Sequence, residues 1–271
     1  MKKIKIDAYG VLEKVREEKP VVHHLTNWVT IYDCAQIVKV LGGSPVMAHA
    51  PEEVAEMAGI ASSLVLNIGT LTVDFIESMK VAAKSANKRG IPVILDVCGA
   101  GATRLRDKKS YELLEQTHIN IIKGNASEIA RLGGKDVRSK GVDASVIKEN
   151  MRSIALSLAK KYSATVVVTG SADIVTDGKV TYFVKNGHTM MTHVVGTGCM
   201  AASVIGAFAA VERNLVLAAA SALVCFEVAA ENAAPKSSGP ASFKENLFDE
   251  LYRLDQKTID RMQCVESCKE W

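Results

Sequence analysis

Long runs of aliphatic residues alternate with amphipathic stretches along the first two thirds of this 271-residue chain. The clearest run is Pro92–Val97, in which Val, Ile and Leu stand side by side. Such runs are typical of strands that are buried on both faces of a parallel sheet. We therefore predict strands over the ranges Val21–Leu25, Ser44–Ala48, Ser63–Ile68, Pro92–Val97, Ile119–Lys123 and Thr165–Gly170.

Segments of helical periodicity lie between the predicted strands. Pro20, Gly42 and Gly90 each follow such a segment, and both residue types commonly end helices. The predicted helices cover Lys5–Lys19, Val29–Leu41, Leu71–Arg89, Asp107–Gln116 and Ala144–Lys161, with others opening near Pro51 and Ala126, and the chain is expected to be helical from Cys199 onward. Asp177-Gly178, between two strand-like segments, predicts a β-hairpin, and Gly133–Gly141 is expected to be an exposed loop.

This alternation predicts an α/β fold of three layers, α/β/α, around a mainly parallel central sheet with an antiparallel hairpin at its edge. Neither a linker nor an internal repeat interrupts the pattern. We therefore expect residues 1–271 to form a single domain.

Composition narrows the class of protein. The net charge of +3 is small and the basic residues are dispersed, so we expect no nucleic-acid partner. The longest apolar stretches, Met200–Val211 and Leu215–Phe226, fall short of the ~20 residues that span a bilayer, and we expect buried helices and no membrane association. The six cysteines contain no C-x-x-C pair, which indicates free thiols in a reducing cytoplasm; Cys264 and Cys268 are expected to share a helix face incidentally.

Polar residues follow several predicted strands, where open α/β sheets bind their ligands. Asp96 ends an apolar strand, and a carboxylate there is costly unless it is paired, hydrated or bound to a cation. Together with Glu128 it is a candidate ligand for Mg²⁺, although a loop cap and a helix-dipole partner are the alternative roles of these two residues. Lys123 is a candidate point charge for phosphate, and Thr169 places a hydroxyl at the same edge.

The stretch from Val194 to Ser203 joins a glycine-rich turn to an alanine-rich helix. The first N–H groups of such a helix form an anion site, here offered by Gly196, Thr197, Gly198 and Cys199. Cys199 stands at the positive end of the helix dipole, which favours a thiolate. This arrangement suits phosphoryl transfer.

A dinucleotide site is the competing interpretation, because Gly196–Ala201 matches G-x-G-x-x-A. That pattern should follow the first strand of a βαβ unit, and an Asp or Glu should stand about 20 residues further along the chain. Here it follows a hairpin, and Leu217–Ser221 contains no acid. The chain also lacks G-x-x-x-x-G-K-[ST], so a kinase without a Walker-type loop is favoured over a nicotinamide oxidoreductase.

Taken together, these motifs resemble the hydroxyethylthiazole kinases of the ribokinase-like superfamily. The motifs that carry the resemblance are His24–Asn27, Gly43–Met47, Leu66–Leu71, Asp96 with Gly99–Thr103, Gly124–Ile129, Thr169-Gly170 and Gly196–Cys199. The resemblance covers nearly the whole chain, from about Lys19 to Phe243. The resemblance implies a ribokinase-like fold and ATP-dependent phosphorylation of the hydroxyl of 4-methyl-5-(2-hydroxyethyl)thiazole, a salvage step towards thiamine.

The resemblance also implies roles for individual residues and an assembly. The implied roles are substrate contacts for Met47, Asn27, Gly69 and Gly196, ATP contacts for Lys123 and Thr169, magnesium binding for Asp96 and Glu128, an anion hole from Gly196 to Cys199, and general-base catalysis for Cys199. Related kinases carry aspartate at the last position, so we expect a modest base and slow turnover. A homotrimer with active sites between subunits is implied as well.

Two positions depart from the family pattern. Val97-Cys98 stands where Pro-Val is usual, and Lys123 stands where arginine is usual. Lysine keeps the positive charge but cannot form the two parallel hydrogen bonds that an arginine guanidinium makes to a phosphate. Two alternatives stay open on the sequence: a related kinase acting on hydroxymethylpyrimidine or pyridoxal, and a catalytically weak thiazole-binding protein.

Overall fold

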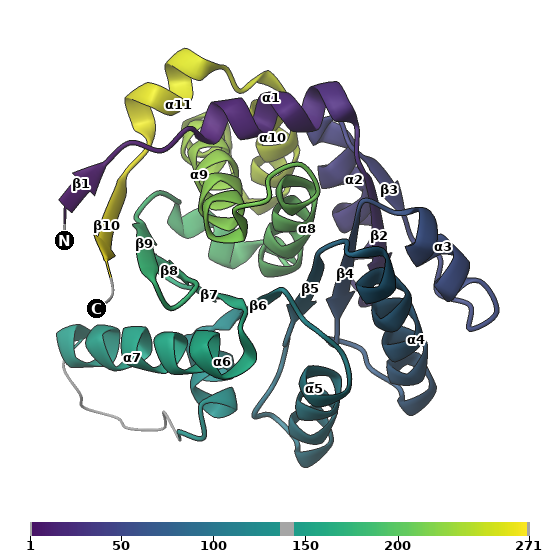
Figure 1. Ribbon diagram of the computed structural model, residues 1–271. Helices are drawn as coiled ribbons and strands as arrows, with labels where there is room; N and C mark the ends of the chain where they lie inside the picture. The colour runs from purple at the N-terminus through teal and green to yellow at the C-terminus, as the bar shows by residue number, and fades with distance from the viewer. Residues whose placement is uncertain (1, 136–143, 270–271) are drawn as a thin grey trace.

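The computed structural model describes residues 2–135 and 144–269, and a ten-stranded sheet runs through this part of the chain (Figure 1). The strand order is β1-β10-β9-β8-β7-β6-β5-β4-β2-β3. The strands are β1 (Lys2–Ile4), β2 (Val21–Leu25), β3 (Ser44–Val46), β4 (Ser63–Asn67), β5 (Val93–Asp96), β6 (Ile121–Asn125), β7 (Thr165–Thr169), β8 (Asp173–Thr176), β9 (Val180–Val184) and β10 (Val265–Lys269). Most of the loop predicted at Gly133–Gly141 lies outside the described residues.

The sheet has a parallel and an antiparallel part. All neighbouring strands from β3 to β7 pair in parallel, and β7, β8, β9, β10 and β1 pair antiparallel in that order. The predicted α/β class with a mainly parallel sheet is therefore confirmed. The predicted hairpin is formed by β8 and β9, and Gly178 takes the positive φ of 87° that its turn needs.

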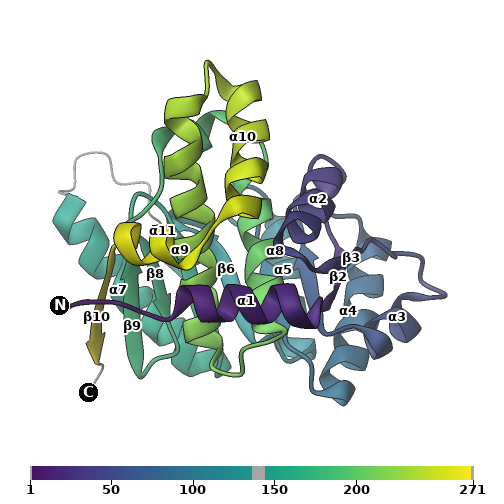
Figure 2. The same ribbon diagram turned by 90° about the horizontal axis from the view of Figure 1, so that it is seen from above.

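Helices cover both faces of the sheet, as Figures 1 and 2 show. One layer holds α1 (Ala8–Glu18), α2 (Ile31–Leu41), α8 (Thr197–Ala209), α9 (Leu215–Ala233), α10 (Pro240–Arg253) and α11 (Gln256–Met262). The other layer holds α3 (Val54–Ile60), α4 (Val73–Arg89), α5 (Arg104–Gln116), α6 (Ala126–Leu132) and α7 (Ala144–Tyr162). Two short 3₁₀ helices, η1 (Thr189–His193) and η2 (Ala234–Lys236), flank α8 and α9.

The ends of the chain differ from the sequence prediction. The residues from Cys199 onward are not helical throughout, because β10 returns to the sheet and pairs with both β9 and β1. Cys268 lies within β10 and Cys264 lies just before it, so the helix face predicted for them is wrong. A five-residue strand whose partners are 80 or more positions away carries little local signal. All six cysteines are free, as predicted.

The alanine-rich α9 is a core helix. The segment Leu215–Lys236 is long and apolar enough to cross a membrane by composition alone, with a mean hydropathy of 1.6, but 78% of its apolar window is buried inside the protein. Small side chains allow α8 and α9 to pack closely on each other and on the sheet.

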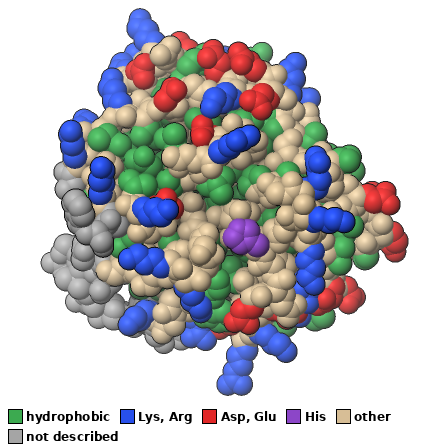
Figure 3. Space-filling model, in the orientation of Figure 1, with side chains coloured by type: hydrophobic (Ala, Val, Ile, Leu, Met, Phe, Trp, Pro, Cys, Tyr) green, Lys and Arg blue, Asp and Glu red, His purple; other side chains and the backbone are tan. Residues whose placement is uncertain are grey.

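On the face seen in Figure 3, lysine and arginine side chains are spread around the rim, with acidic and hydrophobic side chains between them.

The placement of α8 is fixed by direct contact with the strands. A Cβ on Gly206 would lie 2.5 Å from Val65 Cγ2, so only glycine allows the helix to approach this closely. Ser63 donates a hydrogen bond to the Gly206 carbonyl at 2.8 Å. His24 pairs with Ser203 at 3.1 Å, and burial lowers the pKa of His24 to about 4. These contacts hold α8 against β2 and β4, and its first turn then lies at the carboxyl ends of these strands, where Cys199 contacts Asn27 and Asn67.

Candidate active site

The turn before α8 has the geometry of an anion site. Gly196 caps the helix with φ of 92°, and a Cβ there would overlap with the methyl group of Thr30. Both the left-handed backbone and the close contact require glycine. The first turn of α8, which begins at Thr197, directs its N–H groups towards the strand ends.

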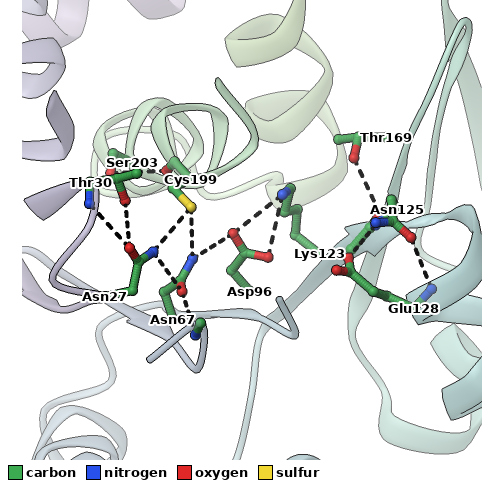
Figure 4. A network of polar contacts seen from close by, with 12 residues as sticks. Asn27, Thr30, Asn67, Asp96, Lys123, Asn125, Glu128, Thr169, Cys199 and Ser203 are labelled. Atoms are coloured by element: carbon green, nitrogen blue, oxygen red, sulfur yellow. Dashed lines mark hydrogen bonds and ion pairs between the residues drawn. The ribbon is translucent and has the colours of Figure 1, made fainter. Parts of the chain in front are cut away.

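Cys199 is held by two buried asparagines (Figure 4). Asn27 Nδ2 donates to Cys199 Sγ at 3.2 Å, and Asn67 Nδ2 lies 3.4 Å from the same sulfur. Asn67 also donates to Asp96 Oδ2 at 2.8 Å. We call Asn27, Asn67, Asp96, Lys123 and Cys199 the thiol network; it joins the ends of β2, β4, β5 and β6 to the start of α8.

The surroundings of Cys199 favour its thiolate. A hydrogen bond from Cys98 lowers the pKa of the Cys199 thiol to about 5, and Thr30, Lys123 and Asn27 act in the same direction against the effect of burial. The hydrogen bond with Cys199, together with burial and the neighbouring carboxylates, raises the pKa of Cys98 and keeps it in the thiol form. A cysteine that is ionised at neutral pH can accept a proton from a bound alcohol.

Lys123 links the strand ends to the anion turn. Its Nζ lies 3.3 Å from both oxygens of Asp96, and a Cβ on Gly198 would lie 3.2 Å from it. Burial raises the pKa of Asp96 to about 7 against the opposing charge of Lys123. Burial disfavours the charge of Lys123, but Asp96, Glu128 and Cys199 outweigh burial and raise its pKa. A positive charge is therefore fixed beside the N–H groups of α8.

Asp96 and Glu128 offer the hard oxygen donors that Mg²⁺ prefers. Glu128 Oε1 accepts from Gly99 N and Oε2 accepts from Asn125 N, each at 2.7 Å, so the carboxylate is fixed as part of a capping box. Each oxygen keeps a further lone pair, which fits contact with a hydrated ion rather than an all-protein cage. The described residues contain no cluster of three or more His, Cys, Asp or Glu side chains placed to hold a metal.

The other predicted residues lie around the network. Gly69 donates its N–H to Asn67 Oδ1 at 2.9 Å, and a Cβ there would lie 3.1 Å from Asn27 Cβ. Met47 directly follows β3, and its carbonyl lies 3.2 Å from His49 Nδ1 rather than from a residue of the thiol network. Thr169, at the end of β7, donates to the Gly124 carbonyl at 3.4 Å. The functional roles of these residues stay predictions.

Thr169 and the anion turn also line a cavity of about 550 Å³. We call it the donor pocket; its wall includes Thr197 and Gly198 of α8, the loop from Thr169 to Asp173, η1, and Leu223, Phe226 and Glu227 of α9. The volume is in the range of small-molecule and cofactor sites. The pocket and the thiol network therefore meet at the first turn of α8.

Sequence reasoning missed two residues that shape the site. Thr30 donates its hydroxyl to Asn27 Oδ1 at 3.0 Å and packs against Gly196, so it orients the asparagine that holds Cys199. Arg106 donates to the carbonyls of Ile68, Gly69 and Cys98 at 2.7 to 2.9 Å and ties together the loops after β4 and β5. Both contacts join distant segments, and a local pattern does not reveal them.

The fold and the site together define a class: a small-molecule kinase with a ribokinase-like fold. A ribokinase-like superfamily protein from Enterococcus faecalis aligns over 93% of this chain and 98% of its own with a TM-score of 0.62, which at 12% identity shows the fold alone.

The family follows from closer relatives. The model of the Hydroxyethylthiazole kinase family matches residues 12–257, and the chain belongs to that family. Hydroxyethylthiazole kinase from Methanosarcina mazei is 52% identical over 255 residues, covering 94% of this chain and 98% of that protein. The structure of a hydroxyethylthiazole kinase from Pyrococcus horikoshii is 40% identical, with a TM-score of 0.90 over 97% of this chain and 99% of the other.

Proposed function

We propose that this protein transfers the γ-phosphoryl group of ATP to the hydroxyl of 4-methyl-5-(2-hydroxyethyl)thiazole, giving the phosphate ester and ADP in thiamine salvage. The observation that carries the proposal is the position of Cys199, held by two asparagines at the head of a helix whose N–H groups form an anion site. The relatives that are about half identical over most of the chain bear the corresponding enzyme name.

The chain supplies a base and a positively charged environment for phosphoryl transfer. The Cys199 thiolate accepts the proton of the substrate hydroxyl, while Asn27 and Asn67 hold the sulfur in place. Lys123 and the N–H groups of Gly196–Cys199 stabilise the charge on the transferring group. Met47, Gly69 and Gly196 bound the thiazole site, and Thr169 contacts the nucleotide.

Asp96 and Glu128 are the residues that would hold Mg²⁺ through water and the phosphates of ATP. Asp96 lies at the end of β5, and Glu128 lies on α6, which follows the neighbouring parallel strand β6. The ion supplies charge neutralisation at the phosphate oxygens when it is bound. Lys123 keeps the Asp96 carboxylate oriented by pairing with both of its oxygens.

A homotrimer with sites between subunits is part of the proposal. The apolar residues Trp28, Val29, Tyr32 and Val195, which are 49 to 73% exposed, lie beside the active site. Burial of such a group in a subunit contact is favourable. Sedimentation should give about three times the chain mass of 29.1 kDa, and a monomer at assay concentration would remove this part of the proposal. The free thiols support a cytoplasmic location.

An ADP-release assay over three acceptors tests the function. The acceptors are the hydroxyethylthiazole, hydroxymethylpyrimidine and pyridoxal, with an acceptor-free reaction as the control for ATP hydrolysis. We expect the highest kcat/KM with the thiazole. Faster turnover of either other alcohol would contradict the substrate assignment, and tight thiazole binding without turnover of any acceptor would indicate a binding protein.

A further inference from the structure

An acidic pair in the wall of the donor pocket has no part in the mechanism above. Glu227 lies on α9 and Asp173 begins β8, and both side chains line the pocket. They are 6% and 2% exposed. The two carboxyl groups interact: burial and then Asp173 raise the pKa of Glu227 well above its ordinary value, so Glu227 is held in its protonated form.

Unlike the neighbouring acids, Glu227 has a buried carboxyl oxygen that receives no hydrogen bond from the described residues. Asp173 Oδ1 accepts from Gly170 N at 2.8 Å, and Glu231 Oε1 accepts from Asn186 Nδ2 and Gly187 N at 3.0 and 2.9 Å. Glu227 Oε2 is buried and has no hydrogen-bond partner among the described residues. A buried oxygen without a partner costs free energy in the empty protein, and a ligand that donates a hydrogen bond recovers it.

The rest of the pocket indicates the ligand. Thr197 and Gly198 of the anion turn and Thr169 line one part of it, which suits phosphates. Leu223 and Phe226 of α9 provide an apolar wall that suits a flat base. With Glu227 protonated, the acid pair carries at most one negative charge and repels the phosphates less than two carboxylates would.

We propose that the Asp173–Glu227 pair is the specificity-determining contact for the nucleoside part of the phosphoryl donor, with the free acceptor capacity of Glu227 receiving a hydrogen bond from that nucleoside. The donor group is a ribose hydroxyl or the exocyclic amine of the base. The inference rests on the proposed kinase activity only for its kinetic readout, because nucleotide binding can be measured directly.

Two substitutions at one position separate acceptor loss from a structural effect. Glu227→Leu removes the acceptor and replaces the carboxyl group with an apolar side chain of similar size. We expect KM for ATP to rise about five- to thirtyfold, with kcat and KM for the thiazole within about twofold of the wild type. Glu227→Gln keeps a carbonyl acceptor and can donate its amide to Asp173, so it should stay within about twofold of the wild type for ATP.

Ser221→Ala is the matched control. Ser221 is buried on the same helix with no partner among the described residues, and it is not part of the pocket wall. We expect it to leave KM for ATP unchanged. An unchanged KM for ATP in Glu227→Leu, or an equal rise in the Gln and Leu variants with unaltered thermal unfolding, would overturn the proposal.

Nucleotide analogues identify the donor group. The wild type is compared with Glu227→Leu for ATP, 2′-deoxy-ATP, 3′-deoxy-ATP and inosine triphosphate, in which the amine is replaced by a carbonyl. The analogue that lacks the recognised group should lose affinity in the wild type and lose nothing further in the Leu variant. Equal effects of every analogue in both proteins would refute the contact.

Calorimetric titration with ADP keeps this test independent of the reaction. Weaker ADP binding by Glu227→Leu supports the inference even if the thiazole is not phosphorylated, in which case only the proposed function fails. ADP binding that is equal in the wild type and in the Leu variant overturns the inference while leaving the kinase proposal intact.

Discussion

The thiol network and the donor pocket with its acid pair both border the first turn of α8, and they differ in how their polar groups are satisfied. In the network, Asn27 and Asn67 donate to Cys199, and Asp96 has partners in Asn67 and Lys123. In the pocket, Glu227 keeps a buried oxygen without a partner among the described residues. The polar groups of the network are thus paired with one another before any ligand binds, whereas the pocket keeps a free hydrogen-bond acceptor that a ligand can use.

The largest expected effect comes from replacing Cys199, the general base of the thiol network. Cys199→Ala should lower kcat by about 10²-fold, the lower end of the range for general acid–base catalysis, because the residue is expected to be a modest base. Cys199→Asp places a carboxylate at the same position and should exceed the alanine variant in kcat. Steady-state assays with ATP and the thiazole measure both.

Thermal unfolding of the two variants is the control, since neither should change the fold. An alanine variant with the kcat of the wild type would show that Cys199 only lines the site. An aspartate variant faster than the wild type would show that proton removal limits turnover.

The next effect concerns the turn that both regions share. Gly196→Ala should destabilise the protein by more than Gly90→Ala, because both glycines have positive φ but only Gly196 faces another side chain, the methyl group of Thr30. The φ penalty alone is about 1–2 kcal/mol, which Gly90→Ala should display. Urea unfolding gives both values, and the substitution at Gly196 should also raise KM for the thiazole.

Equal losses for the two alanine variants would contradict the tight contact with Thr30. A Gly196→Ala variant that binds the thiazole like the wild type would instead remove Gly196 from the substrate site.

The smallest expected effect is a pH dependence of protein stability that arises from Glu227 in the pocket and not from the thiol network. Burial, together with Asp173 and Glu231, raises the pKa of Glu227 well above its ordinary value. A raised carboxyl pKa means that the folded protein binds more protons than the unfolded chain above pH ~4.5, so stability falls as pH rises. Glu227→Gln does not titrate, and its stability relative to the wild type should increase by up to about 1.4 kcal/mol per pH unit in that range.

Thermal unfolding of the wild type and Glu227→Gln between pH 5 and 8 measures this difference, with ~1.4 kcal/mol per unit as its upper limit. A difference that is constant with pH would mean that Glu227 is ionised in the folded protein. Ser221→Ala, which has no titrating group, should show a constant difference.

The sequence predicted what local patterns and the strand-end rule determine. The alternation of strands and helices, and the meeting of Asp96, Lys123 and Cys199, follow from short-range periodicity and parallel topology. The strand that holds Lys123 continues two residues further than predicted, to Asn125, so the lysine lies inside β6 and pairs with β5.

Contacts between distant segments could not be predicted in this way. The pairing of β1 with β10 joins residues more than 250 positions apart, as Lys2 opposite Ser267 shows. The Asp173–Glu227 pair likewise depends on how α9 packs over β8, and in the sequence Glu227 is one of two acids in an apolar helix. Packing, rather than propensity, decides such contacts.

The close approach of α8 to the sheet at Gly206 has a mechanical consequence. With no side chain at Gly206 between helix and strands, and with Ser63 and His24 bonded across the contact, α8 and the strands β2 and β4 are held together as one rigid unit. The position of Cys199 relative to Asn27, which follows β2, and Asn67, which ends β4, is then set by this packing. Adjustment to differently sized alcohols falls to the exposed side chains at the margin of the site.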